Sequence, residues 1–186
     1  VDDTSALFST HPDWLQDPAD AVLGGIVGPS DSERALDVSN PEALAWLGDL
    51  MRRYRDDWHM GWIKLDFAYL AFLFPPRGNP ELSSVEAYHD ALAVVRDALG
   101  PDVFYLGIGM VGMNFGVVDG MRLTLDDGPT WEDRSPFGFA EAGTLKGTVR
   151  TAARRYYLHG RVWLTHADLL FFRTAPGSPT LTMEEA

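Results

Sequence analysis

Apolar positions along the chain follow helical spacing in some stretches and form short continuous runs in others. Three stretches have the spacing of a helix with one apolar face, at 41–58, 85–99 and 143–158. Short apolar runs bounded by turn residues predict five strands, at 34–38, 62–67, 103–108, 117–124 and 161–165. Strands and helices therefore alternate over most of the chain, with one strand-to-strand turn after residue 108.

Helix-capping residues support two of the predicted helix starts. Asn40 stands directly before a proline, a pairing typical of a helix N-terminus. Ser83 and Glu86 have the spacing of a capping box, and residues 182–185 repeat that spacing. The first 33 residues, rich in Pro, Gly, Asp and Ser, are expected to be irregular.

The alternation predicts an α/β fold with a parallel sheet and helices packed outside it. The predicted strands are continuously apolar, which is typical of strands covered on both faces. A doubly wound sheet and a (β/α)8 barrel both fit this order. No glycine-rich phosphate-binding motif follows a strand, which disfavours the nucleotide-binding folds. No repeat or linker divides the chain.

One strand, W-I-K-L-D-F at 62–67, carries a polar pair within an apolar run. Lys64 and Asp66 are two residues apart, so they point to the same face of a strand. We expect this pair to be buried, and a buried ion pair rarely stabilises a fold better than apolar side chains would. The pair therefore indicates a functional site.

Other charged side chains stand at the C-terminal ends of the predicted strands, where barrels collect their catalytic residues. Including the pair, they are Asp37, Lys64, Asp66, Arg122, Asp126, Asp127, His166 and Asp168. A single Asp after a strand is more often a cap, and D-D-G-P at 126–129 is a turn signal. His166 fits a loop histidine as well as a functional one.

Composition and charge narrow the classes of function. The chain has 186 residues, of which 46% are hydrophobic, as in a packed globular domain. Its net charge of −12 disfavours nucleic acid and anionic membranes as partners, because both attract Lys and Arg. The sequence has no cysteine, and its five histidines lack ligand spacing, so we expect no metal site.

Two carboxylates at one barrel mouth suggest glycoside hydrolysis. In retaining enzymes one carboxylate attacks the anomeric carbon and the other protonates the leaving oxygen. Trp131, near Asp126 in the sequence, would give the acid a less polar setting in which it keeps its proton. Residue spacing by itself does not single out this chemistry.

Five segments, in order along the chain, resemble the α-galactosidases (melibiases) of glycoside hydrolase family 36. They are H-P-D-W-L at 11–15, A-L-D-V-S-N-P-E at 35–42, I-K-L-D-F at 63–67, V-D-G-M-R-L-T-L-D-D-G-P-T-W at 118–131 and H-G-R-V-W-L-T-H-A-D-L-L-F-F-R at 159–173. The resemblance implies a partial (β/α)8 TIM barrel with about strands three to seven present. It implies a single catalytic domain over 1–186, truncated at both ends.

The resemblance also implies an activity: a retaining enzyme that removes terminal α-linked galactose from oligosaccharides without a cofactor. By position, Asp66 is the nucleophile and Asp126 the acid/base, while Asp127 falls where the family varies. The implied substrate contacts are Lys64, Arg122, Asp37, Trp131 and Asp168. The isolated chain is expected to be inactive, and homo-oligomerisation of a longer protein stays open.

Two departures from the family pattern keep alternatives open. Ile108 and Gly109 stand where the family often has Cys-Gly, and T-H-A-D at 165–168 replaces Asn-Asp-Pro-Asp. Both segments would lie near the sugar. A related α-glycosidase or transglycosylase acting on another sugar, or a barrel that binds carbohydrate without turnover, also fits.

Overall fold

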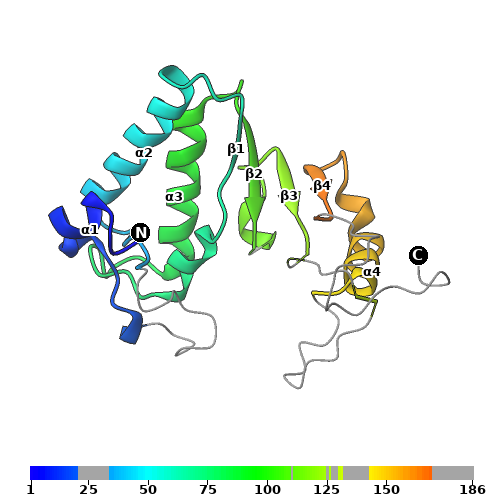
Figure 1. Ribbon diagram of the computed structural model, residues 1–186, viewed down its shortest axis with the longest axis horizontal. Coiled ribbons are helices and arrows are strands. Elements are labelled where there is room, and N and C mark those ends of the chain that lie inside the picture. Colours follow the sequence, from blue (N-terminus) through cyan, green and yellow to red (C-terminus); the bar gives the residue numbers. More distant parts are fainter. Residues whose placement is uncertain (21–33, 110, 125, 127–129, 132–142, 169–186) are drawn as a thin grey trace.

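The protein is described from a computed structural model, which describes residues 1–20, 34–109, 111–124, 126, 130–131 and 143–168. Within these residues, four parallel strands form one sheet in the order β1-β2-β3-β4 (Figure 1). They are β1 (Trp62–Lys64), β2 (Phe104–Ile108), β3 (Gly120–Arg122) and β4 (Leu164–His166). The prediction of a parallel sheet is confirmed.

Helices connect and flank these strands. The α-helices are α1 (Ala6–Thr10), α2 (Pro41–Asp56), α3 (Ser84–Leu99) and α4 (Leu145–Arg155). Short 3₁₀ helices are η1 (Pro12–Trp14), η2 (Pro18–Asp20), η3 (Ala68–Leu73), η4 (Val111–Asn114) and η5 (Tyr156–Leu158). Helices α2 and α3 lie side by side next to β1, and α4 lies on the β4 side of the sheet (Figure 1).

The sheet register brings the C-terminal ends of the strands to one edge. Lys64 of β1 lies opposite Leu106 of β2. Farther along β2, Ile108 is level with Arg122 of β3, which in turn is level with His166 of β4. Residues that follow these positions therefore meet at the same edge, as in other parallel sheets.

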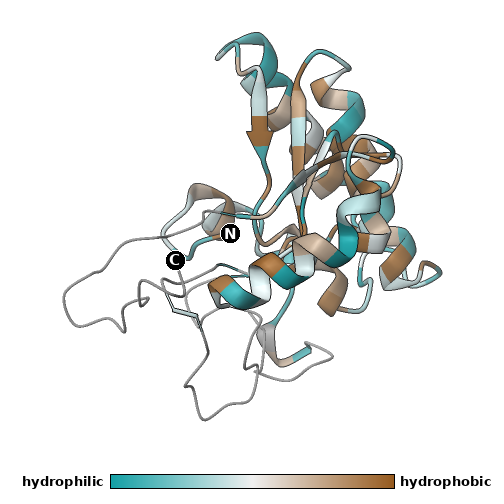
Figure 2. Cartoon of the chain, turned by 90° about the vertical axis from the view of Figure 1, so that its right-hand side faces the viewer, coloured by the Kyte–Doolittle hydropathy of each residue, from teal (hydrophilic) through white to brown (hydrophobic). Residues whose placement is uncertain are grey.

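The predicted caps and core stripe of the helices are observed. The Asn40 side chain accepts hydrogen bonds from the first backbone amides of α2. At α3, Ser83 Oγ accepts from Glu86 N at 3.2 Å, and Glu86 Oε2 accepts from Ser83 N at 2.8 Å. The apolar stripe of α3, which is Tyr88, Leu92, Val95 and Leu99, is buried in the main core. The helices show both hydrophobic and hydrophilic residues, as one-sided burial requires (Figure 2).

The first predicted strand, 34–38, is wrong as a member of the sheet. Leu36 instead forms an isolated antiparallel bridge with Leu15. The amide of Asp37 donates to Trp14 O at 2.7 Å, and the amide of Gln16 donates to Ala35 O at 2.9 Å. These bonds pair the segment with residues 14–16, and no backbone pairing joins it to β1 in the described residues. Residues 1–20 are also more regular than expected, because α1, η1 and η2 form there.

Strand β1 is shorter and more exposed than predicted. It ends at Lys64, and Phe67 has a left-handed backbone with φ of 54°, which no strand can continue through. Only Ile63 of β1 is buried, and 52% of Trp62 is exposed. The predicted capping box at 182–185 lies outside the described residues. No helix within the described residues is long and apolar enough to span a membrane.

Candidate active site

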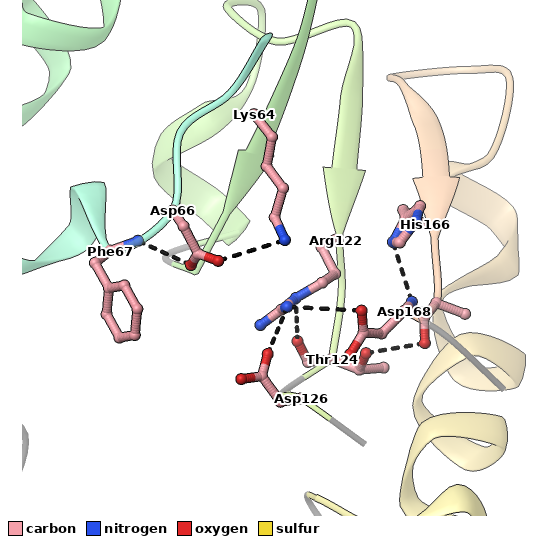
Figure 3. A network of polar contacts seen from close by, with 9 residues as sticks. Lys64, Asp66, Phe67, Arg122, Thr124, Asp126, His166 and Asp168 are labelled. Atoms are coloured by element: carbon pink, nitrogen blue, oxygen red, sulfur yellow. Dashed lines mark hydrogen bonds and ion pairs between the residues drawn. The ribbon is translucent and has the colours of Figure 1, made fainter. Parts of the chain in front are cut away.

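The pair singled out in the sequence sits at the end of β1. Lys64 Nζ lies 3.4 Å from Asp66 Oδ2, so the two side chains share one face, as their spacing predicted (Figure 3). Their expected burial is wrong: 34% of the Lys64 side chain and 40% of the Asp66 side chain are exposed. In β1 the face that carries Trp62 and Lys64 is exposed, and only Ile63, on the other face, is buried.

The turn after β1 fixes one oxygen of Asp66. The amide of Phe67 donates to Asp66 Oδ1 at 2.9 Å, while Oδ2 faces Lys64 (Figure 3). Phe67 adopts its left-handed conformation at this point, and η3 begins at the next residue. The turn therefore directs the Asp66 carboxylate to the sheet edge and sends the chain away from it.

A buried guanidinium organises the end of β3. Arg122 is only 6% exposed, and its Nη1 lies 2.6 Å from Asp126 Oδ1 and 3.7 Å from Asp168 Oδ1. Its Nε donates to Thr124 O at 3.1 Å. A buried cation needs such partners, because burial removes its hydration. Arg122 thus joins Asp126, next to β3, to Asp168, which follows β4 (Figure 3).

Local bonds hold Asp168 in place after β4. The amide of Asp168 donates to His166 Nδ1 at 3.1 Å, and Asp168 has a φ of 67°. Thr124 Oγ1 donates to Ala167 O at 3.1 Å and ties this turn to the one after β3. Only 14% of the Asp168 side chain is exposed. His166 here supports the turn through its ring nitrogen.

Tyr69 is a further residue whose phenol is affected by the charges of the site, and the sequence did not single it out. Burial raises the pKa of the Tyr69 phenol, the charges of Asp66 and Asp126 raise it further, and Arg122 lowers it. Charge interactions of this kind weaken with distance and with solvent screening. The charges of both candidate catalytic carboxylates thus act on this phenol. The only signal in the sequence was an aromatic residue three positions after Asp66.

Asp37 is buried, and its carboxylate is bonded to neighbouring loops. It is 2% exposed, and its Oδ1 accepts from Ser39 Oγ at 2.6 Å and from Ser39 N at 3.1 Å. Its Oδ2 accepts from Gly78 N at 2.8 Å. Both oxygens thus stabilise loops, and a substrate contact by Asp37 stays a prediction. Trp131 is partly buried, and its role stays a prediction; Asp127 lies outside the described residues.

A cavity of about 420 Å³ adjoins the site on the β1 side. Asp66, Phe67 and Tyr69 form part of its wall, and apolar residues of α2, α3 and the 34–38 segment form much of the rest. Among the described residues, no group of three or more acidic or histidine side chains is arranged to hold a metal ion. The polar groups of the site are thus carboxylates, one ammonium, one guanidinium and one phenol.

No protein-family model matches the chain. Among solved structures, the α-galactosidase TtGalA from Thermus thermophilus in complex with stachyose matches 100% of this chain at 30% identity, with a TM-score of 0.74. The same enzyme with p-nitrophenyl α-D-galactopyranoside matches 100% of the chain at 30% identity, with a TM-score of 0.73. This chain is α-galactosidase-like.

The comparison decides between the two folds that the sequence left open. The α-galactosidase-like chain is a partial (β/α)8 barrel, as predicted, with four of its parallel strands in the described residues. It spans 39% of the TtGalA chain in one complex and 37% in the other.

Proposed function

We propose that this chain forms the catalytic part of a retaining glycosidase that removes terminal α-linked galactose from oligosaccharides. The observation that carries the proposal is the pair of carboxylates at the strand ends of an α-galactosidase-like barrel: Asp66 lies 3.4 Å from Lys64 after β1, and Asp126 lies 2.6 Å from Arg122 after β3. TtGalA, the similar enzyme, was solved with stachyose and with an aryl α-galactoside. Both ligands support a galactoside as the substrate class.

In the first step, Asp66 attacks the anomeric carbon while Asp126 protonates the departing glycosidic oxygen. The C–O bond to the leaving group breaks, and an ester forms between the sugar and Asp66. The Phe67 amide and Lys64 Nζ hold the Asp66 carboxylate at the sheet edge, which keeps its attack trajectory fixed. Lys64 is also free on the solvent side to contact a sugar hydroxyl.

In the second step, Asp126 takes a proton from water, the water oxygen attacks the anomeric carbon, and Asp66 is released. The ion pair with Arg122 suits Asp126 in this role as a base. Asp126 must carry a proton in the first step, so we expect bound sugar to draw it away from Arg122. Its 84% exposed side chain has room for that movement.

The stereochemistry of the first product tests this proposal. In a protein containing this chain, early NMR spectra of hydrolysis of an α-galactoside should show the α-anomer of galactose. Asp66→Asn should fold normally and lose turnover by at least about 1,000-fold, because the nucleophile is gone. Asp102→Asn, an exposed change at the opposite end of β2, is the matched control.

Formation of the β-anomer would contradict retention, and turnover like the wild type in a folded Asp66→Asn protein would contradict the nucleophile. A transfer product, galactosyl-oligosaccharide in place of free galactose, would identify a transglycosylase that uses the same carboxylates.

A further inference from the structure

We propose that Tyr69 positions Asp66: the ring of Tyr69 rests on Gly109 at the end of β2 and thereby fixes the turn that carries Asp66. Tyr69 would act through Asp66 and would not itself react. The inference rests on the proposed role of Asp66 as the nucleophile. It assigns a task to a side chain that packs against the end of β2 and shows no catalytic signature in the sequence.

The contact between Tyr69 and Gly109 is close. A Cβ atom added to Gly109 would lie 2.6 Å from Tyr69 Cδ1 and 3.0 Å from Tyr69 Cγ. The ring therefore lies directly against the backbone of Gly109, where no larger residue fits. Gly109 also has a φ of 69°, a region that favours glycine. The contact between the flat ring and the glycine backbone therefore fixes the position of Tyr69.

The supported turn is short and strained. Two residues separate Asp66 from Tyr69, and one of them, Phe67, has the left-handed φ of 54°. Such a conformation in a bulky residue persists only where surrounding contacts enforce it. The Phe67 amide is also the donor to Asp66 Oδ1. Loss of the Tyr69 support would therefore shift the amide and the carboxylate that it holds.

The turn is only partly covered by other side chains, so few other contacts hold it. Asp66, Phe67 and Tyr69 border the cavity of about 420 Å³, so side chains do not fill that side of the turn. The ring of Phe67 is 59% exposed, and its centroid lies 6.0 Å from that of Tyr69. On the β1 side the turn is tied to the sheet by the bond from Leu65 N to Leu106 O at 3.4 Å, and the contact of Tyr69 with Gly109 anchors its other end.

Kinetics of a protein that contains this chain provide the first test. Tyr69→Ala should lower kcat about 100-fold with KM within about threefold, because misplacing a nucleophile by about 1 Å costs that much at the transition state. Tyr69→Phe, which keeps the ring, should restore kcat to within about threefold of the wild type. Equal losses in both variants, or a change confined to KM, would overturn the proposal.

Gly109, the other residue of the contact, can be changed independently of Tyr69. Gly109→Ala should lower kcat by pushing the ring away, yet add little further loss in a Tyr69→Ala background, since the contact is already gone. Gly116→Ala is the matched control: Gly116 also has a positive φ, of 77°, but nothing lies within 4 Å of an added Cβ. It should keep kcat near the wild-type value. Additive losses at Tyr69 and Gly109 would contradict a shared contact.

A titration of the chain alone separates failure of this inference from failure of the proposed function. The Tyr69 phenol is followed by its ultraviolet absorbance, and Tyr69→Phe identifies its signal among the six tyrosines. Besides burial, the charges that act on its pKa are those of Asp66, Asp126 and Arg122. Asp66→Asn should lower the pKa of Tyr69 whether or not the protein hydrolyses galactosides. An unchanged titration would show that Tyr69 does not lie beside Asp66 and would overturn the inference.

Discussion

At the scale of single residues, the site is held by contacts between near neighbours in the sequence. Asp66 accepts from the amide of Phe67, and Arg122 bonds to groups two and four residues ahead of it. The spacing of Lys64 and Asp66 was enough to predict that they share a face. The contact from Arg122 to Asp168 could not be predicted, because it depends on the register of β3 against β4.

Removal of the buried guanidinium should destabilise the chain. We expect Arg122→Met to lower the free energy of unfolding by about 3 kcal/mol, because it removes a buried cation that lies beside the mostly buried Asp168 carboxylate and bonds to Asp126. Urea unfolding followed by circular dichroism measures the change. Arg52→Met is the control, since its ion pair with Asp49 is exposed and should contribute less than about 1 kcal/mol. Equal effects of the two variants would contradict the structural role of Arg122.

At the scale of elements, helices were more predictable than strands. The bounds of α3 follow from a capping box and an apolar stripe, both of which are local in sequence. Strand membership is not local: the 34–38 segment has an apolar pattern like that of β1, yet its backbone bonds to residues 14–16. The end of β1 was also missed, because nothing in the sequence marks the left-handed turn at Phe67.

The capping box of α3 gives a pH-dependent prediction. Hydrogen bonds from the Ser83 amide and hydroxyl hold the pKa of Glu86 below its ordinary value of 4.5. A lowered pKa means that the ionised carboxylate stabilises the fold at neutral pH and that this stabilisation is lost as pH falls through the folded-state pKa. Glu86→Gln should therefore reduce the free energy of unfolding at pH 7, and the difference from the wild type should shrink toward about pH 3. Urea unfolding at both pH values measures it; a difference independent of pH would contradict the assignment.

At the scale of the whole molecule, the described sheet is a set of four strands rather than a closed barrel. The alternation of strands and helices predicted the parallel sheet, and the resemblance carried by five segments predicted the barrel. The contact of Tyr69 with Gly109 could not be foreseen, because it joins the ends of β1 and β2, which meet only in the folded sheet. Barrel active sites are built from residues at the ends of several different strands.

The open sheet leads us to expect that the isolated 186-residue chain does not hydrolyse p-nitrophenyl α-galactoside. A complete barrel has about eight strands around its active site, and this chain spans 39% of the TtGalA chain. Release of p-nitrophenol by the purified chain, compared with its Asp66→Asn variant, measures the activity. Robust release that depends on Asp66 would show that these strands alone form a working site.

The central claim is that Asp66 forms a covalent bond to the sugar, and trapping that bond tests it most directly. A protein containing this chain would be incubated with a fluorinated galactosyl substrate whose glycosyl-enzyme ester breaks down slowly, then digested and sequenced by mass spectrometry. The account predicts one galactosyl label, on the Asp66 carboxylate, and none in the Asp66→Asn variant. A label on another residue, in an active and folded protein, would contradict it.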